Sequence, residues 1–331
     1  MKIYTDADAS LEPLAGKTVA ILGYGNQGRA QALNLRDSGV TVVVGNRQDS
    51  YFEQAQADGF APLPILEAAA IADYLFILTS DESQPLIWDE QIAPGISAGN
   101  TLVWASGYNI GYGLIAVPPD VDVVMVAPRM TGNMVRTLFE HGKGAMAQVA
   151  VHQDSSGDAW ARMMAVAKGI GATRGGVFES SFREEAELDL FAEQVVWAGL
   201  TAWFEECFTL GLEHGFSPEL MVLELYVSGE AAEILGAMSR NGFYRQMTHH
   251  STTSQYGTLS RAPHLLNDEV RARMRNSLVN DIQGGAFARE WSDEQAGGSR
   301  KLAELKEAVL NNAMSRAEEE VIPLVRRAHA L

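Results

Sequence analysis

The chain has 331 residues, enough for about two domains with a sizeable buried core. An apolar fraction of 47% and a charged fraction of 20% are typical of globular proteins and exclude global disorder. The net charge of −17 argues against nucleic acid or an anionic membrane as the main partner.

Targeting and redox signals are sparse. No apolar run reaches the ~20 residues that span a bilayer. The N-terminus carries Asp6, Asp8 and Ser10, which a signal peptide would not. The single cysteine, Cys207, excludes an intrachain disulfide and favours a reducing compartment. We therefore expect a cytoplasmic protein, and the aromatic neighbours of Cys207 predict a buried structural thiol.

The most specific local pattern is Gly23-Tyr24-Gly25-Asn26-Gln27-Gly28, between the apolar run Val19–Leu22 and a stretch with helical spacing. Gly23 permits a tight turn, Gly25 lets a pyrophosphate approach the backbone, and Gly28 lets the helix pack on the strand. Free N–H groups and the helix dipole then face the phosphates. We predict that these six residues bind a dinucleotide; the alternative is a glycine-rich turn without a ligand.

A second cofactor determinant is expected after the next strand, in the loop Asn46–Ser50. Arginine and serine there suit the 2′-phosphate of NADP, whereas an acidic residue suits the ribose 2′-hydroxyl of NAD. Arg47 and Ser50 favour NADPH, while Asp49 could repel a phosphate. The loop therefore predicts NADPH, with NADH still possible and a solvated Arg47 as the alternative.

The first half of the chain alternates strand and helix signals. Further apolar runs occur at Val40–Val44, Tyr74–Leu78, Thr101–Ala105, Val121–Val126 and Met146–Val151. Helical spacing fills several of the gaps between them. This alternation predicts an α/β fold with a doubly wound parallel sheet, here a Rossmann NAD(P)-binding domain over residues 1–181.

The second half has no convincing strand. Long helices are predicted at Phe191–His214, Pro218–Ser239 and Ala303–Ala330, within an all-helical domain over residues 182–331. Asp189 and Glu193 stand four apart near its start, so a helix would place both carboxylates on one face. Such oxygen ligands suit Mg²⁺, although acidic helix faces are usually only solvated.

Nine motifs are spread along almost the whole chain: GYGNQG, ALNLRDSGV, VDVVMVAP, VAVHQDSSG, AKGIGATRGGV, ESSFREEAELDLFAEQ, STTSQYG, NDIQGGAFAREW and EQAGG. Together they resemble the class I (short-chain) ketol-acid reductoisomerase family. The resemblance implies a Rossmann domain, a knotted helical domain and an active site completed across a homodimer. It also implies alkyl migration of an acetohydroxy acid on two Mg²⁺ ions, followed by reduction of the 2-oxo acid with NADPH.

The resemblance assigns roles to individual residues. Asp189 matches the bridging aspartate and Glu193 the adjacent glutamate. Two further glutamates, four apart, come from the partner's helical domain in this family. The second matches Glu230, but the first falls on Tyr226 when counted back from Asn241-Gly242. Ser251 matches the serine that contacts the substrate carboxylate.

Three polar positions depart from the family pattern. Ser106 stands in place of the histidine of H-G-F-N, and Arg129 in place of the lysine of A-P-K. Met130-Thr131-Gly132 replaces a glycine-proline run. Ser106 and Gly132 are also expected at the cofactor.

These departures predict a weakened isomerase. Tyr226 removes a hard anionic ligand, Arg129 does not release a proton readily, and Ser106 lacks the proton exchange of imidazole. The leading hypothesis is an NAD(P)H-dependent reductase of a small 2-oxo acid or related imine, whose isomerase step is weakened or lost.

In this hypothesis Asp189, Glu193 and Glu230 hold one metal ion or act as acid groups. Arg129 clamps a carboxylate, and Ser106 or Tyr226 donates to the reacting oxygen. One alternative is an authentic, divergent ketol-acid reductoisomerase of branched-chain amino-acid biosynthesis. Another is a catalytically inactive nucleotide-binding partner.

Overall fold

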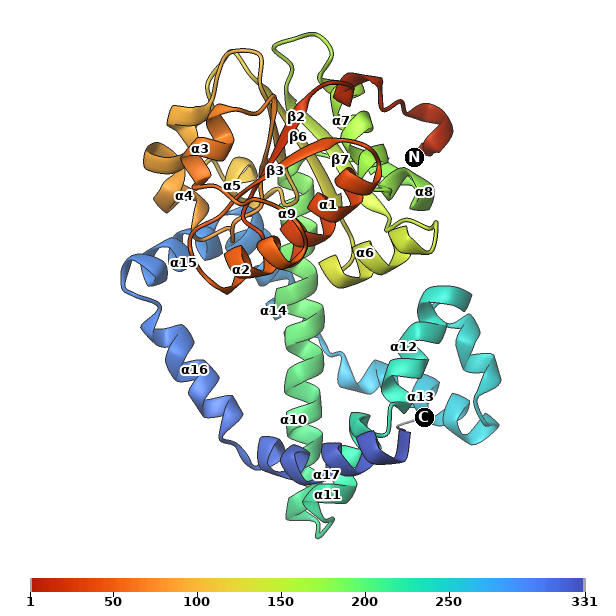
Figure 1. Cartoon of the computed structure of the whole chain (residues 1–331). Coiled ribbons are helices and arrows are strands. Elements are labelled where there is room, and N and C mark those ends of the chain that lie inside the picture. Colours follow the sequence, from red (N-terminus) through yellow and green to blue (C-terminus); the bar gives the residue numbers. More distant parts are fainter. Residues whose placement is uncertain (1, 330–331) are drawn as a thin grey trace. The chain divides into compact units, whose positions relative to one another are not determined.

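The computed structural model describes residues 2–329 and divides into two compact units, one up to Asp189 and one from Leu190. The first is an α/β unit and the second a helical unit (Figure 1). The predicted fold class is confirmed. The domain boundary between residues 181 and 182 stays a prediction.

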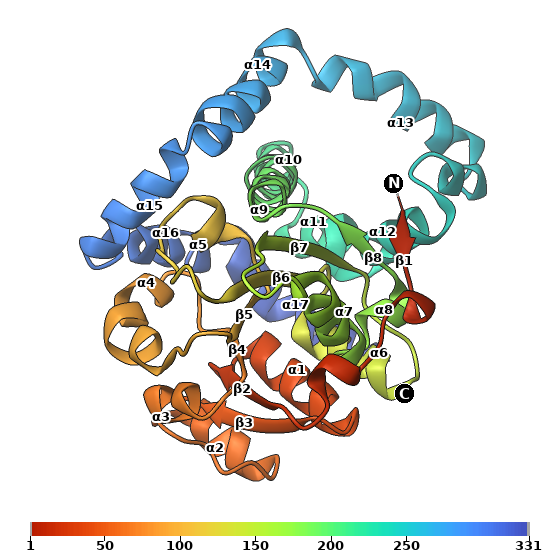
Figure 2. The same ribbon diagram turned by 90° about the horizontal axis from the view of Figure 1, so that it is seen from above.

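The α/β unit is built on an eight-stranded sheet with the order β1-β8-β7-β6-β5-β4-β2-β3. Its strands are β1 (Ile3–Tyr4), β2 (Thr18–Leu22), β3 (Thr41–Gly45), β4 (Tyr74–Ile77), β5 (Thr101–Trp104), β6 (Asp122–Pro128), β7 (Ala147–Gln153) and β8 (Val177–Glu179). Figure 2 shows these strands from above. Five neighbouring strands, β3, β2, β4, β5 and β6, are mutually parallel, as the alternating pattern predicts.

The helices of this unit follow the strands in alternation. They are α1 (Asn26–Asp37), α2 (Ser50–Ala57), α3 (Ile65–Ala70), α4 (Gln84–Ile87), α5 (Tyr108–Gly111), α6 (Gly132–Glu140), α7 (Ala159–Gly169), α8 (Ala172–Gly175) and α9 (Phe182–Phe191).

Both faces of the sheet are buried, because successive strand residues point to opposite sides. Val19 and Ile21 of β2 pack with α1 and α7 in one apolar cluster. Ala20 and Leu22 pack with α3 and the start of α9 in a second cluster. This double cover explains why the strands read as continuous apolar runs.

The sheet departs from the prediction at β7, which runs antiparallel to β6. The chain leaves β6 at Pro128, forms α6 and re-enters the sheet at Ala147, which pairs with Pro128. The connection starts and ends at the same edge of the sheet. It is therefore not a crossover connection, and β7 runs back antiparallel to β6. The apolar pattern alone does not distinguish these two directions.

The helical unit contains α10 (Ala198–Glu213), α11 (Pro218–Val222), α12 (Glu230–Asn241), α13 (Thr252–Leu265), α14 (Asp268–Asn276), α15 (Ala286–Ala296), α16 (Arg300–Leu310) and α17 (Ala313–His329). The helix predicted at Pro218–Ser239 is interrupted by Gly229, whose φ is 90°. The one predicted at Ala303–Ala330 is interrupted between Leu310 and Ala313, and Ala330 lies outside the described residues.

Apolar packing differs between the units. One buried cluster of the helical unit consists of Phe208, Val222, Ala317 and Val321, while large apolar side chains elsewhere on this unit are exposed. Examples are Trp197, Trp203, Phe216, Phe243, Tyr244 and Tyr256. Cys207 is also exposed, so its predicted burial is wrong: its aromatic neighbour Trp203 is itself half exposed.

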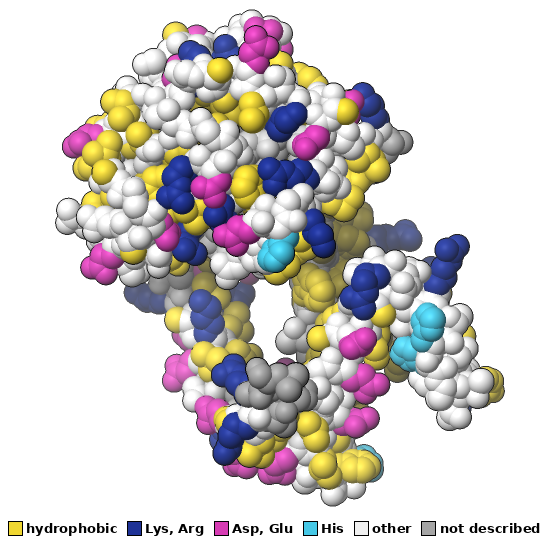
Figure 3. All heavy atoms as spheres, turned by 45° about the vertical axis from the view of Figure 1, so that its right-hand side comes forward, with side chains coloured by type: hydrophobic (Ala, Val, Ile, Leu, Met, Phe, Trp, Pro, Cys, Tyr) yellow, Lys and Arg dark blue, Asp and Glu magenta, His cyan; other side chains and the backbone are white. Residues whose placement is uncertain are grey.

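Within residues 2–329, none of the helices combines the length and apolar character needed to cross a membrane. In Figure 3, basic and acidic side chains are interspersed over the visible face of the α/β unit.

Candidate active site

A cavity of about 590 Å³ lies at the carboxyl ends of the parallel strands, where open α/β sheets bind ligands. Strand β3 lies on one side of β2, and β4 and β5 on the other. The lining residues that come from the predicted site are Gly23, Tyr24, Gly25, Asn26, Gln27, Arg47 and Ser106. The structure therefore brings these residues to one pocket.

The three glycines of the motif differ in the space around them. Gly23 has a φ of 100°, and a Cβ there would lie 2.5 Å from Thr79 N. A Cβ on Gly28 would lie 1.9 Å from Gly23 O, so helix α1 packs directly on the turn. At Gly25, by contrast, no heavy atom lies within 4 Å of an added Cβ. Gly23 and Gly28 are thus required by the fold, while Gly25 faces open space.

Gly132 lies at the N-terminus of α6 and against the glycine motif. A Cβ at this position would lie 1.9 Å from Asn26 O. Gly132 also lines a second pocket of the same unit, of about 370 Å³, together with Ser50, Tyr51 and Arg136. Ser50 therefore lies beside a different cavity from Arg47.

The loop after β3 is held by Asp49, the residue that could have repelled a phosphate. Its carboxylate caps α2, accepting from Tyr51 N at 2.9 Å, and also accepts from Arg47 Nε at 2.7 Å. Burial opposes ionisation, but these bonds outweigh it and lower the pKa of Asp49. The charge of Asp49 is thus compensated within the loop, while the Arg47 side chain is 83% exposed.

Ser106, directly after β5, is bonded to a residue that the sequence did not single out. Its Oγ donates to Asp81 Oδ2 at 3.2 Å and accepts from Tyr108 N at 3.2 Å. The expected donation of Ser106 to a reacting oxygen is therefore not the bond seen here. Asp81 lines the large pocket beside Ser106.

Arg129 connects two acidic residues of α9. Its guanidinium donates to Glu185 Oε1 at 2.6 Å and, through the other nitrogen, to Asp189. Glu185 also accepts from Gly107 N at 2.6 Å and is 2% exposed. Burial raises the pKa of Glu185 to about 7, against the opposing effects of Gly107 and Arg129. Arg129 thus bonds two protein carboxylates here, and its expected role as a clamp for a substrate carboxylate stays a prediction.

The remaining predicted residues belong to the helical unit. Glu193 lies on a π-helical segment, Ala192–Trp197, and is exposed. Glu230 and Ser251 both line a pocket of about 480 Å³, together with Arg240, His249 and His250. The Oγ of Ser251 accepts from Ser254 N at 3.2 Å, which leaves its proton available for a ligand.

Tyr226 is not beside Glu230 in a regular helix. It lies in a π-helical segment, Leu223–Val227, and its hydroxyl donates to Glu318. Burial, reinforced by Glu318, raises the pKa of Tyr226. Because Gly229 then breaks the helix, counting back four residues from Glu230 does not identify a neighbour on the same face. Glu224, on the same π-helical segment, is exposed.

No three His, Cys, Asp or Glu side chains of the described chain are grouped closely enough to hold a metal ion. The donor types nevertheless fit Mg²⁺, since Asp189, Glu193 and Glu230 offer carboxylate oxygens.

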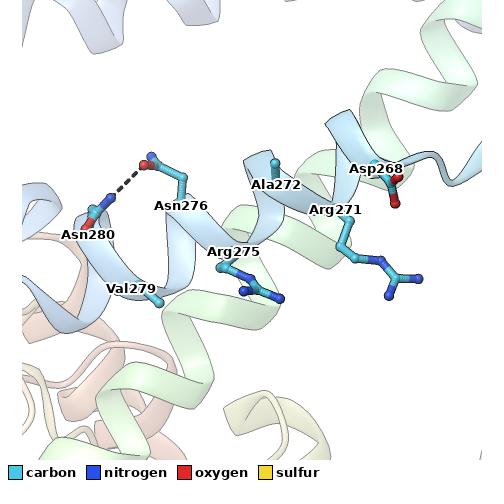
Figure 4. Close-up of a pocket in the computed structure, with 7 residues that line it drawn as sticks. All are labelled: Asp268, Arg271, Ala272, Arg275, Asn276, Val279 and Asn280. Carbon is cyan, nitrogen blue, oxygen red and sulfur yellow. Dashed lines mark hydrogen bonds between the residues drawn. The ribbon is translucent and has the colours of Figure 1, made fainter.

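A further pocket of the helical unit, of about 410 Å³, runs along α14 and contains none of the predicted residues (Figure 4). Its lining residues are Asp268, Arg271, Ala272, Arg275, Asn276, Val279 and Asn280.

The doubly wound sheet and its glycine-lined pocket define the class, a protein with a dinucleotide-binding α/β domain. Residues 13–176 match the family model of the acetohydroxy acid isomeroreductase NADPH-binding domain, and residues 182–326 that of the ketol-acid reductoisomerase C-terminal domain. The chain belongs to the ketol-acid reductoisomerase family.

Individual relatives agree. The chain is 44% identical to the ketol-acid reductoisomerase (NADP(+)) of Pyrobaculum neutrophilum over 98% of its own length and 99% of the relative's. It is also 44% identical to a putative ketol-acid reductoisomerase 3 of Saccharolobus solfataricus, over 98% of each chain. Among solved structures, an NADH-preferring ketol-acid reductoisomerase from an uncultured archaeon superposes with a TM-score of 0.93 and 35% identity, covering 98% of this chain and 99% of that one.

Sequence reasoning missed Asp81 in this region. Asp81 follows β4 in a polar stretch, Ser80-Asp81-Glu82-Ser83, that gives no periodic signal. The position of Asp81 at a strand end was the available clue, because strand ends meet at the pocket. For Glu185 the sequence left two interpretations open, a solvated side chain or a support for Asp189, and the structure shows that it is buried.

Proposed function

We propose that this chain catalyses the ketol-acid reductoisomerase reaction: alkyl migration in an acetohydroxy acid, then reduction of the resulting 2-oxo acid with NADPH. The observation that carries the proposal is the end-to-end similarity, 44% over 98% of the chain, to a relative with that activity in its name. The comparisons do not support the leading expectation of a weakened isomerase or an imine substrate. They fit the alternative, an authentic reductoisomerase, better.

In this proposal the 590 Å³ pocket holds the dinucleotide. Gly25 leaves room for the pyrophosphate, and the N-terminal N–H groups of α1 face it. Arg47, exposed at the pocket, supplies a charge for the 2′-phosphate of NADPH. NADH use stays possible, because a structural neighbour prefers NADH.

In this proposal the substrate is held by residues of two copies of the chain. Asp189 and Glu193 would hold Mg²⁺ together with Glu230 of a second copy, and Ser251 of that copy would donate to the substrate carboxylate. When bound, the metal supplies Lewis acidity to the migrating centre. Arg129 and Glu185 then position Asp189 through the charged bonds already present.

We propose Glu224 as the remaining carboxylate in place of Tyr226. Tyr226 is engaged with Glu318, whereas Glu224 is exposed on the same segment. Tyr226 was identified by counting back four residues from Glu230 along a regular α-helix. The π-helical turn and the break at Gly229 both change this spacing. A carboxylate is a hard anionic ligand of the kind Mg²⁺ prefers, and a neutral phenol is not.

The surface of the helical unit supports a homodimer or a larger assembly of dimers as part of this proposal. Its exposed aromatic residues, among them Trp197 at 52% and Trp203 at 50%, would be covered by a second copy. A cytoplasmic location, as expected for biosynthetic chemistry with NADPH, remains part of the proposal.

The test follows NADPH oxidation with Mg²⁺ and 2-acetolactate, and identifies the product by mass spectrometry. Formation of 2,3-dihydroxy-3-methylbutanoate supports the proposed reaction. NADPH oxidation that gives another product, or none at all, contradicts it.

One observation favours a second candidate, a reductase without isomerase activity. Arg129 already bonds Asp189, the predicted bridging ligand, and would compete with a metal ion for it. This candidate predicts turnover of 3-hydroxy-3-methyl-2-oxobutanoate, the isomerised intermediate, without turnover of 2-acetolactate.

A further inference from the structure

Two adjacent histidines precede Ser251 and line the pocket of about 480 Å³ on the helical unit. His249 ends a short 3₁₀ helix, Arg245–His249, and His250 connects this helix to Ser251 at the start of α13. Glu230, which is also expected at the substrate, lines the same pocket. The helical unit therefore places imidazole rings beside residues that are predicted to hold the substrate.

The backbone of His250 is held from both sides. Its N–H donates to Met247 O at 3.0 Å, and its carbonyl oxygen accepts from Gln255 Nε2 at 2.8 Å. The next residue, Ser251, caps α13 by accepting from Ser254 N at 3.2 Å. His250 and Ser251 are thus fixed relative to each other by bonds within one segment of the helical unit.

A buried glutamine sets the state of the His250 ring. His250 Nε2 lies 2.8 Å from Oε1 of Gln246, which is 3% exposed and whose amide nitrogen donates to Phe243 O. Because an amide oxygen only accepts, the hydrogen of this bond is on Nε2. Nδ1 is then the basic nitrogen of the neutral ring, and it makes no hydrogen bond within residues 2–329.

The other charged side chains of this pocket suit proton exchange less well. They are Glu230, Glu233 and Arg240. An arginine does not release its proton, and a carboxylate takes one up only in acid. Imidazole is the group that both accepts and returns a proton near neutral pH. In the α/β unit, Ser106 stands where the family pattern has a histidine.

We infer that His250 is the proton-exchange residue of the substrate site and acts through Nδ1 on the oxygen at C2 of the acetohydroxy acid. C2 is bonded to the carboxylate carbon, and the proposed function places that carboxylate at Ser251, the neighbour of His250. The ring supplies the imidazole that Ser106 does not, and Gln246 is its positioning residue. The inference rests on the proposed reductoisomerase reaction.

The proton balance closes with this one ring. His250 takes the proton of the C2 hydroxyl while the alkyl group moves with its bonding pair from C2 to C3. C2 becomes the carbonyl carbon, and the C3 oxygen keeps the electron pair of the former C=O bond and takes a proton from solvent. Hydride from NADPH then adds to C2, and His250 returns its proton to the C2 oxygen. The ring ends neutral, and one solvent proton is consumed for each NADPH.

The experiment measures turnover of 2-acetolactate and, separately, of 3-hydroxy-3-methyl-2-oxobutanoate, with NADPH and Mg²⁺. His250→Ala should lower kcat ~100-fold or more for both compounds and change KM less than about threefold, because proton transfer is lost and binding is not. Imidazole added to the solution should restore activity on the order of tenfold. His250→Gln should show the same loss of kcat, and it replaces the alanine variant if that variant does not fold.

His249→Ala is the matched control, since it removes the same ring from the same pocket one residue away. It should keep kcat within about threefold of the wild type and gain nothing from imidazole. Gln246→Met removes the acceptor that fixes the ring and should lower kcat ~10-fold, but it should have no further effect when combined with His250→Ala. Gln246→Glu keeps an acceptor oxygen and should recover most of this loss.

The inference is overturned if His250→Ala keeps the wild-type kcat, if imidazole does not restore its activity, or if His249→Ala loses as much. A loss that added Mg²⁺ reverses would make His250 a metal ligand instead, which also overturns it. If the wild type reduces 3-hydroxy-3-methyl-2-oxobutanoate but leaves 2-acetolactate unchanged, the proposed reaction fails, while the role of His250 is still measured by the reduction.

Discussion

The two units of the chain differ in how much of their structure one copy completes. The α/β unit buries both faces of its sheet and forms a complete pocket from its own strand ends. The helical unit leaves large aromatic side chains exposed and carries Glu230 and Ser251 on an open pocket of its own. The comparison teaches that one chain completes the dinucleotide pocket by itself, whereas our proposal has a second copy complete the substrate site and cover the helical unit.

The largest effect is expected where the glycine motif meets helix α1. Gly28→Ala places a Cβ 1.9 Å from Gly23 O, and backbone does not yield as a side chain does. We expect a loss of about 3 kcal/mol or more in the free energy of unfolding of the α/β unit, measured by urea denaturation.

Gly25→Ala is the matched control, since no atom lies within 4 Å of its Cβ. It should fold normally yet bind NADPH on the order of tenfold more weakly, because the methyl group occupies the approach of the pyrophosphate. Equal stability of the two variants would show that α1 is not packed as described.

In the helical unit, the exposed tryptophans are expected to affect assembly instead of folding. The double variant Trp197→Glu, Trp203→Glu places charges on side chains that are about half exposed in one copy. If a second copy covers them, buried unpaired charges should dissociate the assembly at a cost of several kcal/mol. Sedimentation should then show a monomer that still binds NADPH. An unchanged mass would remove this surface from the proposed interface.

Glu185 is expected to make the stability of the α/β unit depend on pH. Burial raises its pKa in the folded state to about 7, from 4.5. Between these values the folded chain holds a proton that the unfolded chain has lost, so stability falls as the pH rises from about 4.5 to about 7. The fall is on the order of 3 kcal/mol at most.

Glu185→Gln should flatten this slope, measured by urea denaturation at several pH values. A slope that is the same in the variant and in the wild type would contradict the assignment to Glu185.

The smallest effect on the fold is expected at Arg47, whose ion pair with Asp49 is exposed. Arg47→Ala should change the free energy of unfolding by less than about 1 kcal/mol. It should lower the affinity for NADPH about tenfold and leave that for NADH nearly unchanged, since only NADPH carries the 2′-phosphate. Equal changes for both cofactors in fluorescence titrations would argue against this role, and Arg47→Lys is the conservative control.

Sequence patterns predicted the parts of this structure that depend on local geometry. The glycine motif was placed between β2 and α1 because turn, strand and helix signals stand side by side. The antiparallel β7 was not foreseen, because an apolar run does not encode strand direction. The Tyr226 alignment assumed a continuous α-helix, and the π-helical segment with the break at Gly229 removes that assumption.

Long-range pairing explains the other gaps. Ser106 and Arg129 stood out as departures from a family motif, but their partners Asp81 and Glu185 lie far away in sequence. The aromatic neighbours of Cys207 had suggested that its thiol is buried. It is exposed because the helical unit leaves many of its large apolar side chains exposed. Such contacts depend on which elements meet, and a single sequence does not state this.

The most direct test of the shared site mixes two inactive variants. Asp189→Asn disables the site from the α/β side, and Glu230→Gln from the helical side. Co-expressed at equal levels, half of the dimers contain one chain of each, and each such dimer has one intact site. We predict recovery of about a quarter of wild-type turnover with 2-acetolactate, NADPH and Mg²⁺, although neither variant is active alone. A mixture as inactive as its components would contradict an active site built from two chains.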